Sequence, residues 1–255
     1  MQILGVRIDE VTKQHALEKS LEFLHSDKSH KIFTPNPEMV VDAQRDPSFG
    51  AVLNESDLNL CDGFGLWLAT GRRAERITGV DFMLDLCVLA EKENRSVYLL
   101  GSWSDEVVKK TAQVLQEKFP CLRIVGHNVG VKIERSKDCK ITYDTDKNEE
   151  IMYDIITKAP DILFVAFGHL KQEKWIDKNL RDLPSVKIAM GVGGAFDFIS
   201  GHVKRAPRFM RKMGLEWMWR LVREPWRVGR ILKATLSFSW VLLRSINFKK
   251  QDTNK

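Results

Sequence analysis

A carboxylate directly after an apolar run is the first feature of this chain that could carry chemistry. Asp62-Gly63 follows the segment Asp57-Leu-Asn-Leu-Cys61, which is typical of a short buried strand. A carboxylate fixed at a strand end can accept a proton as a general base. An Asp-Gly pair is also a common turn or helix cap, so both interpretations stay open on these residues alone.

A proline-rich motif could hold two more polar groups at a strand end. Thr34-Pro-Asn-Pro37 follows the apolar-rich run Lys31-Ile-Phe33. Two prolines stiffen the loop, which would fix Thr34 and Asn36 in a rigid polar site. The same prolines could simply end the strand.

A glycine-rich segment follows another expected strand. Gly191–Gly201 contains Gly193 and Gly194 and, three residues later, Asp197. Glycines let a nucleotide approach the backbone, and the next helix N-terminus can face a phosphate. The spacing is not GxGxxG, so a tight turn and a nucleotide-binding loop fit these residues about equally well.

Metal-binding signals are weak. Asp144-Thr-Asp146 matches the DxD pattern of metal-dependent sugar-nucleotide enzymes, but it lies in the highly polar segment Lys132–Glu150, which we interpret as an exposed loop or an excursion from the fold. The six histidines show no metal-ligand spacing, and we expect His169 at the surface or behind a site. The four cysteines include no CxxC pair and suit a reduced, cytoplasmic protein.

Short β-rich runs alternate with helical patterns through most of the chain. The expected strands are 31–34, 57–61, 96–101, 121–125, 161–167 and 186–190, and the expected helices include 38–45, 65–70, 105–118 and 172–180. This alternation predicts an α/β fold with a Rossmann-like, mostly parallel sheet flanked by helices. Such sheets bind ligands beyond the carboxyl ends of their strands, where Gly101 and the motifs above would lie.

The end of the chain differs from the rest in charge and aromatic content. Residues 203–255 carry a formal net charge of +11, whereas residues 1–202 carry −5. Four of the seven tryptophans lie in this basic segment, and indole rings favour the membrane interface. We therefore divide the chain into an α/β catalytic domain, residues 1–202, and a basic, Trp-rich helical appendage, residues 203–255.

Arginines of the appendage share one face of an expected helix. If the segment is helical, an arc of roughly 80° at 100° per residue holds Arg220, Arg223, Arg227 and Arg230. Arginine pairs well with phosphate, so we expect an anionic membrane surface as a partner. No stretch reaches the roughly 20 apolar residues of a membrane span, and the N-terminus lacks a signal-peptide pattern. We expect a cytoplasmic protein that associates peripherally with the inner face of the membrane.

Seven short segments, taken in order, point to one family. They are Thr34-Pro-Asn-Pro-Glu38, Asp62-Gly63, Glu75–Asp81, Leu99–Gly101, Gln172-Glu-Lys-Trp175, Gly191–Gly201, and Val203–Pro207 with Gly214–Trp217. In type and order they resemble the WecG/TagA/CpsF family of bacterial glycosyltransferases. One match would mean little, but seven collinear matches that span nearly the whole chain are highly specific.

The resemblance implies an inverting transferase. It would move an N-acetylmannosamine-type sugar from a UDP donor to N-acetylglucosamine on undecaprenyl diphosphate, for wall teichoic acid or a related polysaccharide. It implies Asp62 as the general base, with Thr34, Arg76 and Gln172 at further catalytic positions. The implied substrate-binding residues are Asn36, Gly101, Gly193, Gly194, Asp197, Arg220, Arg223 and Arg227. It implies no metal and no other cofactor.

Two departures from the family pattern concern the donor sugar. Gly168-His-Leu-Lys-Gln-Glu173 lacks a proline that relatives often have, and Gly130-Val-Lys132 leads into the polar segment instead of a Gly-(Tyr/Phe)-Phe stretch. Another UDP-hexose or a UDP-hexuronic acid is therefore an alternative donor. The basic tail would also suit nucleic acid, but that function leaves Asp62 without a task, so we expect no nucleic-acid partner. An NAD-dependent oxidoreductase would need a GxGxxG motif, which the chain lacks. The sequence leaves a homo-oligomer as an open alternative.

Overall fold

A parallel sheet forms the centre of the computed structural model, which describes residues 1–102, 104–136, 140–223, 237, 238, 240 and 242. Its six strands pair in the order β4-β3-β10-β9-β5-β6, and every pair is parallel. The strands are β3 (His30–Phe33), β4 (Leu58–Asn59), β5 (Ser96–Gly101), β6 (Arg123–Asn128), β9 (Ile162–Ala166) and β10 (Ile188–Gly191). This confirms the α/β class with a Rossmann-like sheet.

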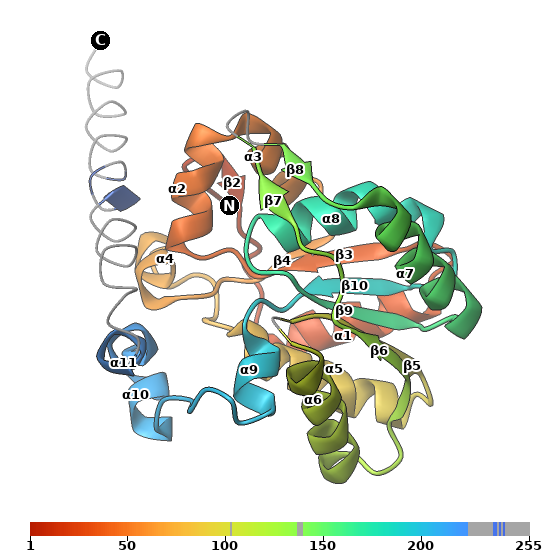
Figure 1. Ribbon diagram of the computed structural model, residues 1–255. Coiled ribbons are helices and arrows are strands. Elements are labelled where there is room, and N and C mark those ends of the chain that lie inside the picture. The colour runs from red at the N-terminus through yellow and green to blue at the C-terminus, as the bar shows by residue number, and fades with distance from the viewer. Residues whose placement is uncertain (103, 137–139, 224–236, 239, 241, 243–255) are drawn as a thin grey trace.

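Helices cover both faces of the sheet (Figure 1). One face carries α2 (Pro37–Arg45), α3 (Pro47–Asn54), α7 (Thr145–Lys158) and α8 (Lys171–Asn179), and the other carries α1 (Lys13–His25), α5 (Gly79–Lys92), α6 (Asp105–Lys118) and α9 (Ala195–Ile199). Successive strand residues point to opposite faces, so Leu163 and Val165 enter one apolar core while Ile162 and Phe164 enter the other. Burial on both faces explains why these strands are continuous apolar runs.

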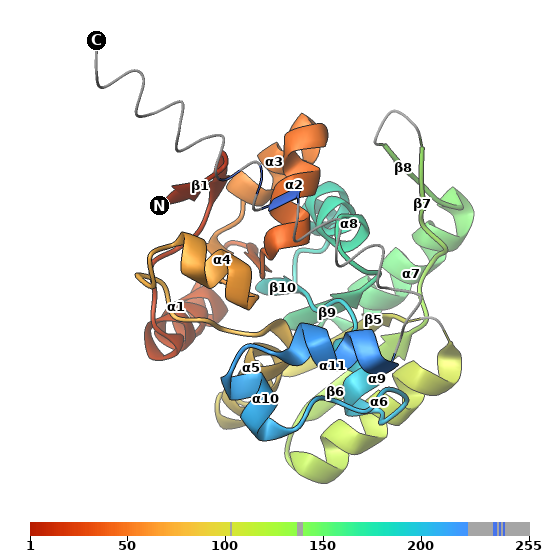
Figure 2. The ribbon, with the colours of Figure 1, turned by 90° about the vertical axis from the view of Figure 1, so that its left-hand side faces the viewer.

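Smaller elements lie around this body. They are the hairpins β1 (Gln2–Ile3) with β2 (Val6–Arg7) and β7 (Glu134–Arg135) with β8 (Ile141–Thr142), the short helices α4 (Phe64–Ala69) and η1 (Leu180–Asp182), and the pair α10 (Arg208–Lys212) and α11 (Glu216–Arg223). Figure 2 turns α10 and α11 toward the viewer, on the same side of the molecule as α4. No helix within the described residues is long and apolar enough to cross a bilayer.

Most described residues of Lys132–Glu150 are exposed, as expected, but the segment is not a loop. The segment forms the β7–β8 hairpin and the first turns of α7. Asp144 is the N-cap of α7, and its Oδ1 accepts the backbone N–H of Lys147 at 3.1 Å. Asn148 is buried, where its side chain accepts the Trp175 indole N–H at 2.8 Å. A buried polar side chain satisfied by a distant partner hides a helix from a hydrophobicity pattern.

Candidate active site

A cavity of about 490 Å³ opens at the carboxyl ends of the sheet strands. Its lining comes from the residues just after β3, β4, β5, β9 and β10, together with the start of α5 and part of the segment 203–216. The lining includes Thr34, Asn36, Asp62, Arg76, Ser102, Gly168, Gln172, Gly193, Gly194, Asp197 and Glu216. Parallel strands end at one edge, so segments far apart in the sequence meet there.

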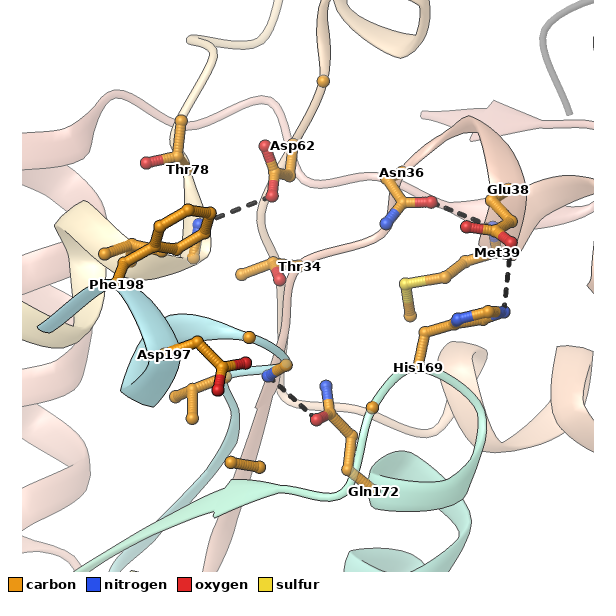
Figure 3. Close-up of a pocket in the computed structure, with 18 of the residues that line it drawn as sticks. Thr34, Asn36, Glu38, Met39, Asp62, Thr78, His169, Gln172, Asp197 and Phe198 are labelled. Atoms are coloured by element: carbon orange, nitrogen blue, oxygen red, sulfur yellow. Dashed lines mark hydrogen bonds and ion pairs between the residues drawn. The ribbon is translucent and has the colours of Figure 1, made fainter. Parts of the chain in front are cut away.

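Asp62 lies on one wall of this cavity beside Thr34 (Figure 3). The Asp62 backbone N–H donates to the Pro35 carbonyl at 3.0 Å, which ties the strand end after β4 to the loop after β3. The backbone N–H of Gly79, at the start of α5, points to Asp62 Oδ2 at a long 3.5 Å. A Cβ at Gly79 would lie 3.1 Å from Thr34 Oγ1, so the helix start packs closely on that hydroxyl. The structure thus brings Asp62 and Thr34 into one cavity, and their catalytic roles stay a prediction.

Cys61 precedes Asp62 in the chain but does not provide a nucleophile. Burial and the adjacent Asp62 charge raise the pKa of the Cys61 thiol to about 12, although Arg76 acts in the opposite direction. A thiol with this pKa stays protonated near neutral pH, and the thiolate is the reactive form. The carboxylate of Asp62 is therefore the better candidate for chemistry at this strand end.

Gln172 anchors the glycine-rich turn after β10. Its Oε1 accepts the Gly193 backbone N–H at 2.9 Å, and its Nε2 donates to Glu173 Oε1 at 2.8 Å (Figure 3). A Cβ at Gly191 would lie 2.7 Å from Gln172 Nε2, so the glycine permits the close approach. Burial raises the pKa of the Glu173 carboxyl, despite the hydrogen bond from Gln172. Gln172 thus supports the turn, and nothing in this geometry gives it a direct part in bond making.

The expected substrate-binding residues lie at different depths of the site. Asn36 caps α2, since its Oδ1 accepts the Met39 N–H at 3.1 Å, and its amide nitrogen turns toward the cavity (Figure 3). The Asp197 carboxylate lies beside the Gly193–Gly194 turn, and a Cβ at Gly194 would be 3.5 Å from its Oδ2. Gly101 is not part of the cavity lining, which begins at the next residue, Ser102. The structure thus places Gly101 behind the wall, where its ideal Cβ would lie 2.8 Å from the Ala166 carbonyl carbon.

Arg76 links the cavity to the chain beyond residue 203. It lines the cavity, and its Nη2 donates to the carbonyl oxygen of Arg211 in α10. Of the three appendage arginines predicted to bind substrate, Arg227 lies outside the described residues. Arg220 and Arg223 are part of α11, but their side chains also fall outside the described part. Their contacts with a diphosphate remain predictions.

His169, which we expected at the surface or behind a site, is part of the cavity wall. His169 lines the cavity, and its Nε2 lies 3.0 Å from Asp42 Oδ2 and 3.8 Å from Glu38 Oε1 (Figure 3). Burial alone would raise the pKa of Asp42, but the hydrogen bond from His169 holds that pKa below its usual value. Lys171 and Phe198 also line the cavity. The departure from the family pattern at residues 168–173 was the one sequence signal for this wall.

Metal ligands do not gather at this site. Within the described residues there is no group of three or more His, Cys, Asp or Glu side chains suited to a metal ion. Asp144 is the N-cap of α7, and Asp146 lies in the first turn of that helix. Whether the reaction needs a metal is not tested by this geometry, so metal independence stays a prediction.

Comparison with known proteins gives a consistent result. The sequence model described as "Glycosyl transferase WecG/TagA/CpsF family" matches residues 1–252. The N-acetylglucosaminyldiphosphoundecaprenol N-acetyl-beta-D-mannosaminyltransferase of Bacillus subtilis (strain 168) is 35% identical over 205 residues, which cover 79% of this chain and 74% of the relative. The protein of the same name from Staphylococcus aureus (strain MW2) is 30% identical over 237 residues, 91% of this chain and 87% of the relative.

Proposed function

We propose, from the premise that this chain belongs to the WecG/TagA/CpsF glycosyltransferase family, that it transfers N-acetylmannosamine from a UDP donor to N-acetylglucosamine on undecaprenyl diphosphate. The new bond forms with inversion at the anomeric carbon, and the product enters wall teichoic acid or a related surface polysaccharide. The relatives are named for this acceptor and this sugar, and the geometry of the cavity supports the chemistry.

The position of Asp62 is the observation that carries the proposal. The acceptor's sugar hydroxyl is a poor nucleophile until a base takes its proton as the new bond forms. Asp62 presents a carboxylate to the cavity next to Thr34, on the wall opposite the Gln172 side chain (Figure 3). A single displacement by the acceptor hydroxyl inverts the anomeric carbon and requires one base, a role that Asp62 can fill alone.

The glycine-rich turn and two cationic side chains of the cavity lining suit the leaving UDP. Gly193 and Gly194 line the cavity with small residues that let a ligand approach the backbone. Arg76 and Lys171 line the same cavity. Positive side chains can stabilise the negative charge that develops on a departing diphosphate without a metal ion. We place the uridine diphosphate at the glycine-rich turn, with the sugar directed toward Asp62.

A lipid-linked acceptor requires the protein to work at the membrane. Three apolar side chains of α10, α11 and their connection are strongly exposed: Phe209 is 64%, Met213 61% and Val222 76% accessible. Phe64 and Leu68 of α4, on the same side of the molecule, are also exposed. An apolar surface within a strongly basic segment suits the headgroup region of an anionic bilayer. We propose peripheral association through this side.

One observation keeps another donor under consideration. Lys171 and His169, the latter hydrogen-bonded to Asp42, lie on the cavity wall at the segment that departs from the family pattern. A UDP-hexuronic acid would present a carboxylate to such groups. A comparison of UDP-N-acetylmannosamine with UDP-hexuronic acids separates the two donors.

The test is UDP release from a panel of UDP-sugars by the full chain, with an undecaprenyl-diphosphate-N-acetylglucosamine analogue as acceptor. Asp62→Asn should lower turnover by about 10²- to 10⁴-fold while UDP binding persists, the usual contribution of a positioned base. The matched control is Asp27→Asn, an exposed aspartate before β3 at the other edge of the sheet. If Asp62→Asn turns over like Asp27→Asn, the assignment of the base is wrong.

A further inference from the structure

An ion pair joins the segment after residue 202 to the start of α5. The Arg205 guanidinium binds Asp81 with both arms, Nη1 to Oδ1 at 2.7 Å and Nη2 to Oδ2 at 2.8 Å. The Arg205 side chain is 16% exposed and the Asp81 side chain is 43% exposed, so solvent screens the pair from the Asp81 side. A two-armed arginine–carboxylate contact fixes orientation as well as distance. The two residues therefore hold the chain segments in one relative position.

The partner of Arg205 is part of a helix cap. Thr78 is the N-cap of α5, where its Oγ1 accepts the Asp81 N–H at 3.3 Å and donates to Asp81 Oδ2 at 2.7 Å. Arg205 Nη2 also reaches Thr78 Oγ1, at 3.2 Å. One guanidinium thus binds both polar side chains of the cap, those of Thr78 and Asp81. A displacement of Arg205 would therefore shift Thr78 and the residue that follows it.

That next residue is Gly79, which faces the proposed base. Its N–H points to Asp62 Oδ2 at 3.5 Å, and a Cβ at this position would lie 3.1 Å from Thr34 Oγ1. The N-terminal amides of a helix favour a negative charge placed before them. The cap therefore determines how the helix end meets Asp62, and Arg205 holds the cap.

The same network reaches α10 and α11. Arg205 Nε lies 3.5 Å from Glu216 Oε1, and Arg211 Nη1 lies 3.5 Å from Asp81 Oδ1. The Trp219 indole N–H donates to the Lys204 carbonyl at 3.0 Å. Glu216 also lines the cavity. The segment 203–223 is thus connected to the α5 cap through several polar contacts at once.

We propose that Arg205 is a positioning residue of the transfer reaction. It clamps the Thr78–Asp81 cap so that the start of α5 holds Asp62 in the orientation that accepts the acceptor's proton. Turnover then depends on the segment 203–223 being seated against α5, which couples the basic appendage to the chemistry. This inference rests on the proposed function, because it takes Asp62 as the base.

The test compares kcat and KM of full-length variants with a short, water-soluble acceptor, so that membrane binding does not enter. Arg205→Met should lower kcat about 10- to 100-fold, as a small misplacement of a catalytic group does, with donor KM and UDP affinity nearly unchanged. Asp81→Asn should have the same effect, and Arg205→Lys should restore part of the activity because it keeps the charge. The matched control is Arg208→Met, since Arg208 is exposed at the start of α10 and makes no ion pair within the described residues.

A double variant separates positioning from simple support of the fold. If Arg205 acts through Asp62, adding Arg205→Met to Asp62→Asn should cause no further loss of kcat, because residues that act as a unit are not additive. A full further loss in that background, or an Arg205→Met enzyme with the kcat of Arg208→Met, overturns the inference. If Arg205→Met fails to fold, the same comparison is made with Asp81→Asn. Asp62→Asn with normal turnover would instead overturn the proposed base, so the two failures are distinguishable.

Discussion

Replacing Gly191 by alanine tests the contact between the end of β10 and Gln172. An alanine methyl group would lie 2.7 Å from Gln172 Nε2 and 3.0 Å from its Cδ. Favourable contacts between such atoms lie at roughly 3.5–4.0 Å, so the two groups must separate by the best part of an ångström. The Gln172 side chain is buried, and hydrogen bonds to Gly193 and Glu173 hold its amide. It cannot move that far without losing at least one of them.

The expected cost follows from these two effects. A buried hydrogen bond lost without replacement costs about 1–3 kcal/mol, and an extra methyl in a packed site costs about 1–3 kcal/mol. The effects share one displacement, so we expect the free energy of unfolding to fall by about 2–4 kcal/mol in total. UDP affinity should fall as well, because the Gly193 turn loses its anchor.

Urea unfolding and calorimetric titration with UDP measure the two quantities. Gly50→Ala, in α3, is the matched control. A methyl group there would meet Ala43 O at 3.6 Å and Ala43 Cβ at 3.7 Å, which are ordinary contact distances. That control should be neutral or more stable by up to about 1 kcal/mol, since alanine favours a helix interior. Adding Gln172→Ala to Gly191→Ala removes the obstacle, so the double variant should lose less stability than the two single losses combined. A Gly191→Ala protein with the stability and UDP affinity of Gly50→Ala would refute the packing argument.

Three further results are expected. Burial raises the pKa of Glu173, so between its pKa in the unfolded chain and this higher pKa the native state binds more protons, and its stability falls as pH rises. Glu173→Gln should therefore gain stability relative to the wild type as pH increases from 4 to 8. A difference in urea unfolding that stays constant with pH would contradict this. Asp144→Ala should lower the free energy of unfolding by about 1 kcal/mol, because α7 loses its N-cap. Sugar transfer should be unchanged by this substitution and by EDTA. A loss of transfer that Mn²⁺ restores would make Asp144 a metal ligand. Met213→Asp with Val222→Asp should weaken sedimentation with anionic liposomes at least tenfold, an effect of about 1 kcal/mol for each added charge. The control pair Tyr153→Asp with Ile156→Asp on α7, whose side chains are also exposed, should not have this effect. Equal losses in both pairs would remove the assignment of this side to the membrane.

The sheet and the centre of the site could be predicted because both depend on local patterns. The strand Ser96–Gly101 and the helix Asp105–Lys118 occur with the predicted bounds, since an uninterrupted apolar run and a helical repeat each define one element. Thr34 and Asp62 could be brought together because the ends of parallel strands meet at one edge. No distance between them was needed for that step.

The elements that could not be predicted depend on contacts between distant residues. The helix α7 was hidden because Asn148, a polar residue on its inner side, is satisfied by Trp175 from another helix. His169 and Asp42 are separated by 127 positions, so neither residue signals the other in the sequence. A side chain whose role is set by a remote partner looks, in sequence, like an ordinary surface residue.

The appendage shows how this affects an argument from charge. In the sequence, the net charge of +11 over residues 203–255 indicates binding to an anionic membrane. In the structure, Arg205 and Arg211 face Asp81, an acid outside the segment, so part of that net charge is compensated within the protein. Glu216, which Arg205 also faces, is already included in the net charge of +11. Fewer positive charges are then left for the bilayer than the composition suggests. The exposed apolar side chains of α10 and α11 must supply more of the attraction, and liposome binding should weaken with salt less than +11 alone would require.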